Sequence, residues 1–517
     1  MYPPSIPLPM KRDSQNVAEY LLEGKEESRQ ALLTLQGGHS YGELCSASIG
    51  VARYLLAAGG IKGDRVLLVS ENTFFWVAAY WGILRAGLVC VPLPPTTSRQ
   101  DLDYILETTE ARFAFLQARF AAKHAPRFGE INCVTDSGLP RRDGLPPQPG
   151  LRQLEDNAQS SQNSSPPIQG SDLAALMFTS GSTGKPRGVM VSHTNIRANT
   201  ESIIHCLRLK SDDRMLTVLP FHYCFGTSLL HTHLRVGGTL VLDSRFMYPE
   251  KVLQRMQETE CTGFAGVPSH FQILLRNSSL REKTFPHLRY VQQAGGHLAP
   301  AFIKELREAL PEAQIFIMYG QTEATARLSC LTPELLDRKL GSVGQGIPGV
   351  KLRVVDKFGL TVQPGEVGEL LAEGENVTLG YWREPEETAT AFRNGALHTG
   401  DLAMADEDGF IYIVDRAKDF VKCGGRRISC RQIEDQLLEY HDLLEVAVLP
   451  IPDDVLGEGV KAFVVPRSPN SKGLKDRLYH FCRNKMPSQL VPREIVMVQA
   501  IPKNSAGKVL KLKLKDG

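Results

Sequence analysis

Two kinds of hydrophobic pattern alternate along the first quarter of the chain. Short runs such as LVCVPL (88–93) are continuously apolar, as in strands buried on both faces. Longer segments with helical spacing of apolar residues lie between them, for example 41–59 and 73–87. This alternation continues to residue 134 and predicts helices packed against a largely parallel sheet.

The same alternation resumes at Asp172 and continues to about Gly341, which predicts a second sheet of the same type. Beyond Gly341 the pattern changes to short strands separated by glycine turns, as in a small antiparallel barrel. The last hundred residues mix strand patterns with helical ones, such as 431–440 and 474–486. They predict a separate α+β unit.

Size and composition narrow the function classes. The 517 residues carry a net charge of +2, so bulk electrostatics gives no reason to expect nucleic acid as a partner. Ten cysteines are scattered without a C-x-x-C pair, which disfavours a zinc site or a disulfide scaffold and fits a reducing cytoplasm. The most apolar run, 76–95, is interrupted by Arg85 and ends in prolines, so we expect no membrane span.

The stretch FTSGSTGKPRGVMVSH (178–193) has the composition of a phosphate-binding loop. Glycines let backbone N–H groups approach an anion, hydroxyl groups add donors, and Lys185 and Arg187 supply positive charge. An apolar strand pattern precedes it, and residues 193–209 after it have helical spacing. A donor-rich loop between a strand and a helix is a common anion site in α/β proteins.

The P-loop of nucleotide hydrolases does not explain this stretch. Thr179 stands where its first glycine is required, and Pro186 stands where its metal-binding Ser or Thr is required. An ordinary Gly/Ser turn remains the alternative on composition alone.

A set of further motifs accompanies this loop, and together they resemble the adenylate-forming (ANL) superfamily of acyl- and aryl-CoA ligases, luciferases and amino-acid adenylation domains. The resemblance covers the chain from residue 40 onward. In chain order the motifs are LPFHYCFG (219–226), QAGGHLAP (293–300), YGQTEAT (319–325), GENVTLGYW (374–382), LHTGDLA (397–403), DRAKDFVKCGGRRIS (415–429) and IPKNSAGKVLKLKL (501–514).

The resemblance implies both the architecture and the reaction. It implies an α/β fold in which residues 1–417 form a large N-terminal domain of two helix-flanked sheets plus a small β-barrel, and residues 418–517 form a mobile C-terminal α+β lid. ATP, Mg²⁺ and a thiol, either CoA or a phosphopantetheine group, are the implied cofactors. A carboxylate attacks the α-phosphorus of ATP, pyrophosphate leaves, and the thiol captures the acyl-adenylate.

The resemblance also assigns nucleotide ligands. Asp401 would accept hydrogen bonds from both ribose hydroxyls, with Arg416 as a second contact, because an ionised carboxylate accepts several bonds. Glu323 would bind Mg²⁺ with Thr183 nearby, as hard oxygen ligands for a hard cation. The remaining ATP- and AMP-binding residues are Thr179, Ser180, Gly181, Ser182, Thr183, Lys185, Arg187, Gly295, Gly296, Tyr319, Gly320, Gln321 and Thr322.

Two lysines would divide the reaction between two positions of the lid. Lys508 would bridge the carboxylate and the α-phosphate during adenylation, as catalysis between two anionic groups requires a cation. Lys418 occupies the family's hinge position, about which the lid would swing. Lys422, Gly424 and Gly425 would then lie at the mouth of the thiol tunnel.

The acid pocket is predicted from the same motifs. His222 stands in the segment where most amino-acid adenylation domains carry an Asp, which disfavours an α-amino acid substrate and makes His222 a catalytic candidate as well. His297 follows the paired glycines and narrows the pocket, and the mixture of side chains suits an aryl or medium-sized acyl acid. The pocket candidates are His222, Tyr223, Phe225, Gly226, Val267, His297 and Thr325.

Three interpretations of the chain remain open at this point. The first is an acid–CoA ligase. The second is a stand-alone adenylating enzyme that loads a carrier protein in trans or passes the acyl group to an amine. The third is a non-catalytic nucleotide-binding homologue, which the presence of Lys508, Glu323, Asp401 and Arg416 disfavours.

Overall fold

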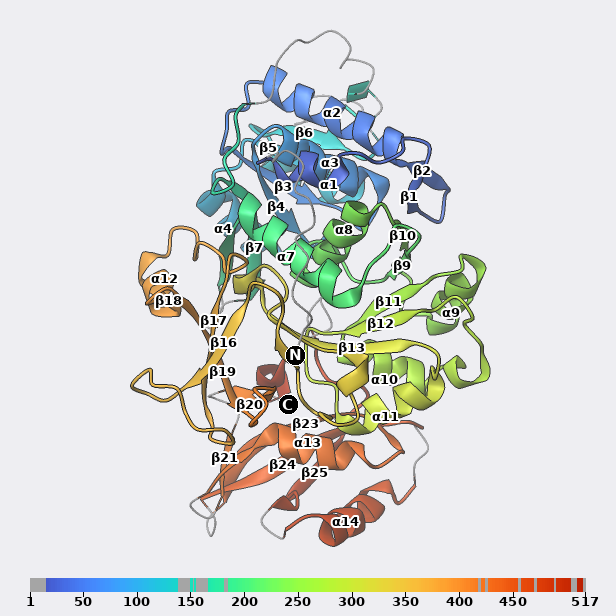
Figure 1. The fold of residues 1–517 in the computed structure, drawn as a ribbon, viewed down its shortest axis with the longest axis vertical. Coiled ribbons are helices and arrows are strands. Elements are labelled where there is room, and N and C mark those ends of the chain that lie inside the picture. The colour runs from blue at the N-terminus through green and yellow to red at the C-terminus, as the bar shows by residue number, and fades with distance from the viewer. Residues whose placement is uncertain are drawn as a thin grey trace.

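The computed structural model describes most of the chain and arranges it in four sheets with helices on their faces (Figure 1). The C-terminal unit lies at the bottom of the view, below helices α10 (Pro268–Arg276) and α11 (Pro300–Ala309) and strand β20 (Ile411–Arg416). The described residues are 15–137, 149–151, 153–154, 166–180, 185–416, 420–423, 426–453, 457–468, 472–487, 490–503 and 509–514.

The first sheet has six strands in the order β6-β5-β3-β4-β7-β8. Its pairs are parallel except for the β7–β8 hairpin. Its apolar strands are buried, as the continuous hydrophobic runs predict. The strands are β3 (Arg65–Val69), β4 (Val89–Leu93), β5 (Phe113–Leu116), β6 (Asn132–Thr135), β7 (Leu173–Ser180) and β8 (Pro186–Ser192).

The second sheet has nine strands in the order β15-β14-β13-β12-β11-β9-β10-β1-β2. The six central strands, from β13 to β1, are parallel, and the strands at both ends are antiparallel. They are β1 (Gln30–Leu33), β2 (Gly38–Ser40), β9 (Arg214–Thr217), β10 (Thr239–Leu242), β11 (Gly263–Gly266), β12 (Tyr290–Gln293), β13 (Gln314–Tyr319), β14 (Ser329–Leu331) and β15 (Gln345–Gly346).

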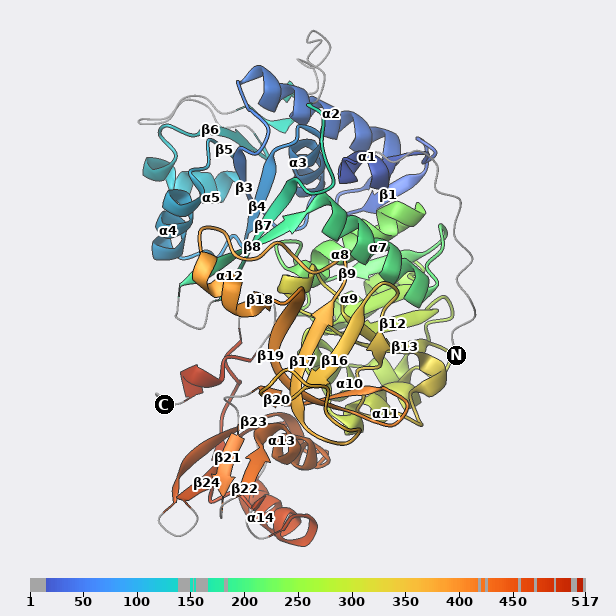
Figure 2. The ribbon, with the colours of Figure 1, turned by 60° about the vertical axis from the view of Figure 1, so that its left-hand side comes forward.

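Helices α7 and α8 lie between the first two sheets, which makes this part of the molecule layered (Figures 1 and 2). Every residue of α8 from Cys224 to Leu234 is buried, as expected for a helix covered on all sides. The helices of this region are α1 (Val17–Leu22), α2 (Tyr41–Ala57), α3 (Phe74–Arg85), α4 (Arg99–Thr109), α5 (Ala118–Lys123), α7 (His193–Leu207), α8 (Cys224–Val236), α9 (Pro249–Glu258), α10 (Pro268–Arg276) and α11 (Pro300–Ala309).

The antiparallel region expected after Gly341 is a five-stranded sheet. Strand β19 pairs with β17, β18 and β20, and no strand pairing among the described residues closes the sheet into a complete barrel. Its elements are β16 (Lys351–Val355), β17 (Gly368–Glu373), α12 (Pro385–Ala391), β18 (Phe392–Arg393), β19 (Ala396–Ala405) and β20 (Ile411–Arg416).

The C-terminal α+β unit has its own sheet, in the order β22-β21-β24-β23 with β25 beside β24. The chain passes from the third sheet to this one between Arg416 and Phe420. No helix in the described ranges is long and apolar enough to cross a bilayer. The elements are β21 (Phe420–Cys423), β22 (Arg426–Ser429), α13 (Cys430–Leu438), β23 (Leu443–Asp453), β24 (Gly457–Pro466), α14 (Leu474–Lys485) and β25 (Glu494–Met497).

One local prediction was wrong. The glycine-rich segment was expected to join a strand directly to a helix, but it joins the two strands of the β7–β8 hairpin. Residues 189–191 read Val-Met-Val, which suits a strand, and they pair with β7 in full register. Helix α7 begins only at His193, at the far end of β8, so its N-terminus is not next to the loop.

Several histidines are buried without a charged partner, and we expect them to make the protein acid-sensitive. Burial lowers the pKa of His231 to about 3 and of His233 to about 4, from an ordinary value of 6.5. Burial likewise lowers the pKa of His270 to about 3. The unfolded chain therefore binds more protons than the folded one between about pH 6.5 and pH 4. In this range each of these histidines lowers the free energy of unfolding by up to about 1.4 kcal/mol for every unit by which the pH falls.

The free energy of unfolding in urea should accordingly fall between about pH 6.5 and pH 5, where carboxylates are still mostly ionised. Replacing His231 by leucine removes one of these groups and should reduce the slope. An unfolding free energy that does not change across this range would contradict the prediction.

Candidate active site

The predicted binding segments meet at one edge of the second sheet. Strands β9, β11, β12 and β13 are parallel neighbours, so their carboxyl ends lie together. LPFHYCFG follows β9, Val267 follows β11, Gly295 follows β12, and Gly320 follows β13. In open parallel sheets this edge is where ligands bind.

Two of the motif glycines are required by close approach. Gly295 has a φ of +81°, and a Cβ there would lie 2.9 Å from Val267 Cγ1 and 3.3 Å from Tyr223 Oη. A Cβ on Gly320 would lie 2.0 Å from the carbonyl oxygen of Ala326. Any larger residue would push these segments apart, so the glycines hold the edge compact.

Asp401 is joined to this edge although it belongs to the third sheet. It lies on β19, is 8% exposed, and accepts a 2.6 Å hydrogen bond at Oδ2 from the hydroxyl of Tyr319. Asp401 pairs with Arg416 in the β19–β20 ladder, which brings both predicted ribose ligands to one place. The structure thus brings together predicted nucleotide residues from two sheets.

Glu323 lies on a short 3₁₀ turn, Thr322–Ala324, directly after β13. The hydroxyl of Tyr381 donates a 3.0 Å hydrogen bond to Glu323 Oε1 and fixes the direction of the carboxylate. No cluster of three or more His, Cys, Asp or Glu that could hold a metal occurs among the described residues. A single oriented carboxylate of this kind fits Mg²⁺, which binds through one or two carboxylates plus phosphates.

Only the two strands that flank the predicted phosphate loop are described. Thr179 pairs with Arg187 across the hairpin, and Lys185 is exposed, with its Nζ 5.4 Å from the ring centre of Tyr104. Arg187 Nε lies 3.0 Å from Glu384 Oε2. Gly181, Ser182 and Thr183 lie outside the described residues, as does the side chain of Ser180.

The predicted acid pocket residues converge on Gly295. Tyr223, Phe225 and Val267 all lie within 4 Å of the position of a Cβ on this glycine. Gly226 allows α8 to start beside the carbonyl oxygen of Pro220, 2.1 Å from where its Cβ would be.

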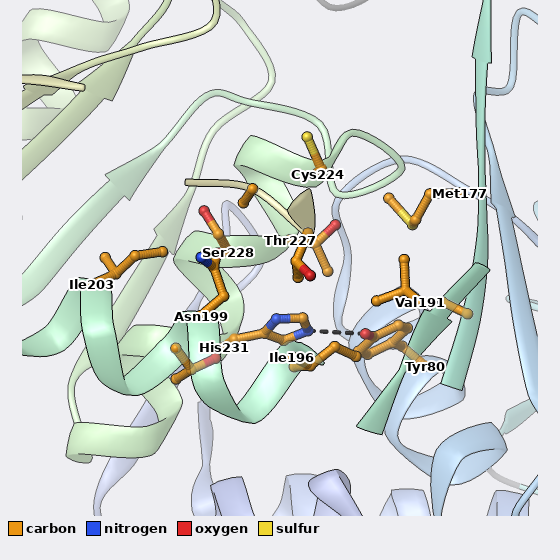
Figure 3. Close-up of a pocket in the computed structure, with 14 residues that line it drawn as sticks. Tyr80, Met177, Val191, Ile196, Asn199, Ile203, Cys224, Thr227, Ser228 and His231 are labelled. Atoms are coloured by element: carbon orange, nitrogen blue, oxygen red, sulfur yellow. Dashed lines mark hydrogen bonds between the residues drawn. The ribbon is translucent and has the colours of Figure 1, made fainter. Parts of the chain in front are cut away.

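A separate small cavity lies between α7, α8 and the β7–β8 hairpin (Figure 3), and Thr325 is the predicted acid pocket residue among its lining. One face of α8, with Cys224, Thr227, Ser228 and His231, lines it together with Thr325, and His231 Nε2 lies 2.9 Å from Tyr80 Oη. The centre of a water molecule can move within about 20 Å³ there. That is room for about one water. Any group larger than a water molecule can enter this cavity only if the side chains that line it move.

His222, which directly precedes Tyr223, is largely buried, and its Nε2 has no hydrogen-bond partner in the part of the chain that the structure describes. Burial lowers the pKa of His222 to about 4. The imidazole is therefore neutral at physiological pH, and its unpartnered nitrogen is able to bind a polar ligand group.

His297 has a different contact from the one expected of a pocket residue. Its Nε2 lies 2.8 Å from both oxygens of Asp435, which belongs to α13 of the C-terminal unit. In this arrangement the imidazole faces the C-terminal unit.

Several predicted residues cannot be placed. Lys418, Gly424, Gly425 and Lys508 lie outside the described residues, and only the backbone of Lys422 is described, paired with Arg427.

The sequence reasoning missed two residues of the site. Tyr381 lies in the quoted motif GENVTLGYW, but only the fold shows its contact with Glu323. Arg327 follows the motif YGQTEAT by two residues and is 1% exposed, packed over the ring of Phe225. The available signal was a charged residue two positions before strand β14 (Ser329–Leu331).

Comparisons with known proteins give consistent results along the whole chain. The profile of the AMP-binding enzyme family matches residues 23–382, and the profile of the AMP-binding enzyme C-terminal domain matches residues 432–508. A feruloyl-CoA synthase from Amycolatopsis is 31% identical over 96% of this chain and 98% of its own length. A long-chain-fatty-acid–CoA ligase from Salmonella typhimurium is 29% identical over 100% of this chain and 97% of its own.

A solved structure supports the same relationship. The o-succinylbenzoate coenzyme A synthetase of Bacillus subtilis, in complex with ATP and magnesium ion, is 26% identical and superimposes with a TM-score of 0.81. The match covers 97% of this chain and 99% of that one.

Proposed function

Since the chain belongs to the AMP-binding enzyme family and is an AMP-forming acid–CoA ligase, we propose how its residues divide the two steps of the reaction. The first step joins a carboxylic acid to AMP and releases pyrophosphate, and the second transfers the acyl group to the thiol of CoA. The observation that carries the proposal is the meeting of Asp401, Tyr319 and Glu323 at the carboxyl edge of the second sheet.

The nucleotide lies along this edge. Asp401, held by the Tyr319 hydroxyl, receives the ribose hydroxyls, and Gly295 and Gly320 leave space for the base and the α-phosphate. The β7–β8 loop, with Lys185, holds the β- and γ-phosphates. Glu323, with Thr183, would hold Mg²⁺, which would supply positive charge against the phosphates.

The acid lies on the other side of the paired glycines, among Tyr223, Phe225, Val267 and Thr325. The neutral imidazole of His222 contacts its polar part. The mixture of aromatic, histidine and small side chains in the predicted pocket suits an aryl or medium-sized acyl group better than a long alkyl chain.

The C-terminal unit, for which we propose the boundary 417/418, supplies Lys508 for adenylation. It then turns about Lys418 to bring Lys422, Gly424 and Gly425 to the thiol. Its contacts with the N-terminal domain include His297 with Asp435, hydrogen bonds from buried Arg276 to the carbonyl oxygens of Leu438 and Leu443, and the packing of Leu438 in an apolar core of the second sheet. These contacts would have to separate during turnover.

Incubation with ATP and a library of carboxylic acids tests the proposed function, with hydroxylamine trapping the activated acyl group. A competent acid should then give AMP, pyrophosphate and a CoA thioester when CoA replaces hydroxylamine. ADP and phosphate as the main products would contradict the assignment. Hydroxamate without thioester would assign the acceptor to a carrier protein or an amine instead of CoA.

A further inference from the structure

Two arginines are buried among the described residues, and only one of them has an anionic partner. Arg276 is 3% exposed, packs over Phe302 and forms an ion pair of 2.5 Å with Glu305. Arg327 is 1% exposed and its guanidinium carbon lies 3.8 Å from the ring centre of Phe225, yet it forms no ion pair with any described residue. An unpaired buried cation is costly, so its retention needs a reason.

The unused donors of Arg327 lie on one edge of the guanidinium. Nη1 makes a long hydrogen bond of 3.4 Å to the carbonyl oxygen of Ala326. Nε and Nη2 are buried and have no hydrogen-bond partner among the described residues. These two nitrogens form the side-on pair whose N–H groups point in parallel and match the two oxygens of one carboxylate.

The group stays charged at physiological pH. Burial lowers the pKa of Arg327 to about 10, and the neighbours that raise it, Cys224, Tyr223 and Cys330, are all neutral at that pH. A permanent positive charge without a counter-ion therefore lies beside Phe225.

The backbone that carries Arg327 is held in a strained conformation. Thr325 has φ +65° and ψ −59°, and the N–H of Ala326 donates a 2.7 Å hydrogen bond to the carbonyl oxygen of Ala324. This is a γ-turn of the rare, strained form. Asn199 bonds both the N–H and the carbonyl oxygen of Arg327, at 3.2 and 2.8 Å. Strain that the surroundings enforce in this way is typical of ligand-binding positions.

The position of the guanidinium links it to the acid. Phe225, which it covers, also contacts the Gly295 position together with Val267 and Tyr223. Thr325, two residues before Arg327, lines the cavity of Figure 3. The cation is therefore packed against Phe225, one of the predicted acid pocket residues.

We propose that the acid substrate carries a second carboxylate, and that Arg327 binds it through its Nε–Nη2 edge while the first carboxylate is adenylated. This inference rests on the proposed function, because it places the acid among Tyr223, Phe225 and Val267.

The test compares dicarboxylic acids with their own monoamides, which keep the size and remove the second charge. The panel runs from malonate to adipate and includes the phthalate isomers, with butyrate, hexanoate and benzoate as simple monoacids. Pyrophosphate release gives kcat/KM for each acid. We expect the best dicarboxylic acid to exceed its monoamide by about 100-fold or more, mainly through KM.

Arg327→Met keeps the volume and the packing on Phe225 but removes the charge. It should reduce the diacid-to-monoamide ratio to below about 3-fold, with a melting temperature equal to or above that of the natural protein because no unpaired charge is buried. Arg276→Met is the matched control: it breaks a buried ion pair, so it should lower the melting temperature and leave the ratio unchanged.

Each result decides the inference. A natural protein that prefers a monoacid, or a diacid preference that persists in Arg327→Met, would overturn it. If Arg327→Met does not fold, the panel on the natural protein decides alone. Activity with monoacids only would overturn this inference and leave the proposed function standing, whereas no AMP from any acid would reject the proposed function itself.

Discussion

Replacing Asp401 with alanine should lower kcat/KM for ATP by about 30- to 1,000-fold, which corresponds to about 2–4 kcal/mol for charged hydrogen bonds lost in a buried site. Asp401 is 8% exposed and already accepts a 2.6 Å bond from Tyr319.

Two milder variants separate ribose binding from damage to the fold. Asp401→Asn keeps the shape and one acceptor oxygen, so its kcat/KM for ATP should lie between that of the natural protein and that of Asp401→Ala. Tyr319→Phe removes only the hydroxyl that orients the carboxylate and should cost about 5- to 10-fold, near 1 kcal/mol. If Asp401→Ala binds and uses ATP almost normally while remaining folded, Asp401 is only a structural residue of β19.

Replacing Lys508 with alanine should abolish most adenylate formation, by about 100- to 1,000-fold, because no cation then offsets charge between the carboxylate and the α-phosphate. Lys508 lies in the segment 504–508, outside the described residues, and the ends of this segment are joined by a β-bridge between Lys503 and Val509. The same variant should still convert supplied acyl-adenylate and CoA to thioester.

Lys418→Pro should have the opposite effect. Proline fixes φ at the proposed hinge, so the adenylate should form while transfer to CoA stalls. The assay supplies synthetic acyl-adenylate plus CoA to both variants and measures thioester release. Equal loss of both steps in both variants would contradict alternation of the lid and the hinge role of Lys418.

The sequence predicted the regular elements well because each has a clear hydrophobic period. The helical spacing of residues 41–59 and 193–209 corresponds to α2 and α7, and the apolar run 88–93 contains β4. The β7–β8 hairpin was not predicted, because the strand pattern Val-Met-Val is short and is followed almost at once by the helical pattern of α7.

The site was predictable only where a motif marks it. The motif YGQTEAT identifies Glu323, but the contact of its carboxylate with Tyr381 joins residues 58 positions apart. Arg327 is an ordinary basic residue in the sequence. Its burial without an ion pair to any described residue becomes visible only when Phe225 and Asn199 are packed around it. The bond between His297 and Asp435 depends on how two parts of the chain dock, which no local pattern encodes.

Transfer of oxygen from the acid to AMP is the most direct test of an acyl-adenylate pathway. A competent acid labelled with heavy oxygen in its carboxylate is turned over with ATP and CoA, and the AMP is analysed by mass spectrometry. Attack of the carboxylate on the α-phosphorus predicts AMP that carries one labelled oxygen, with the other retained in the thioester. Unlabelled AMP, or label recovered in inorganic phosphate beside ADP, would contradict the acyl-adenylate.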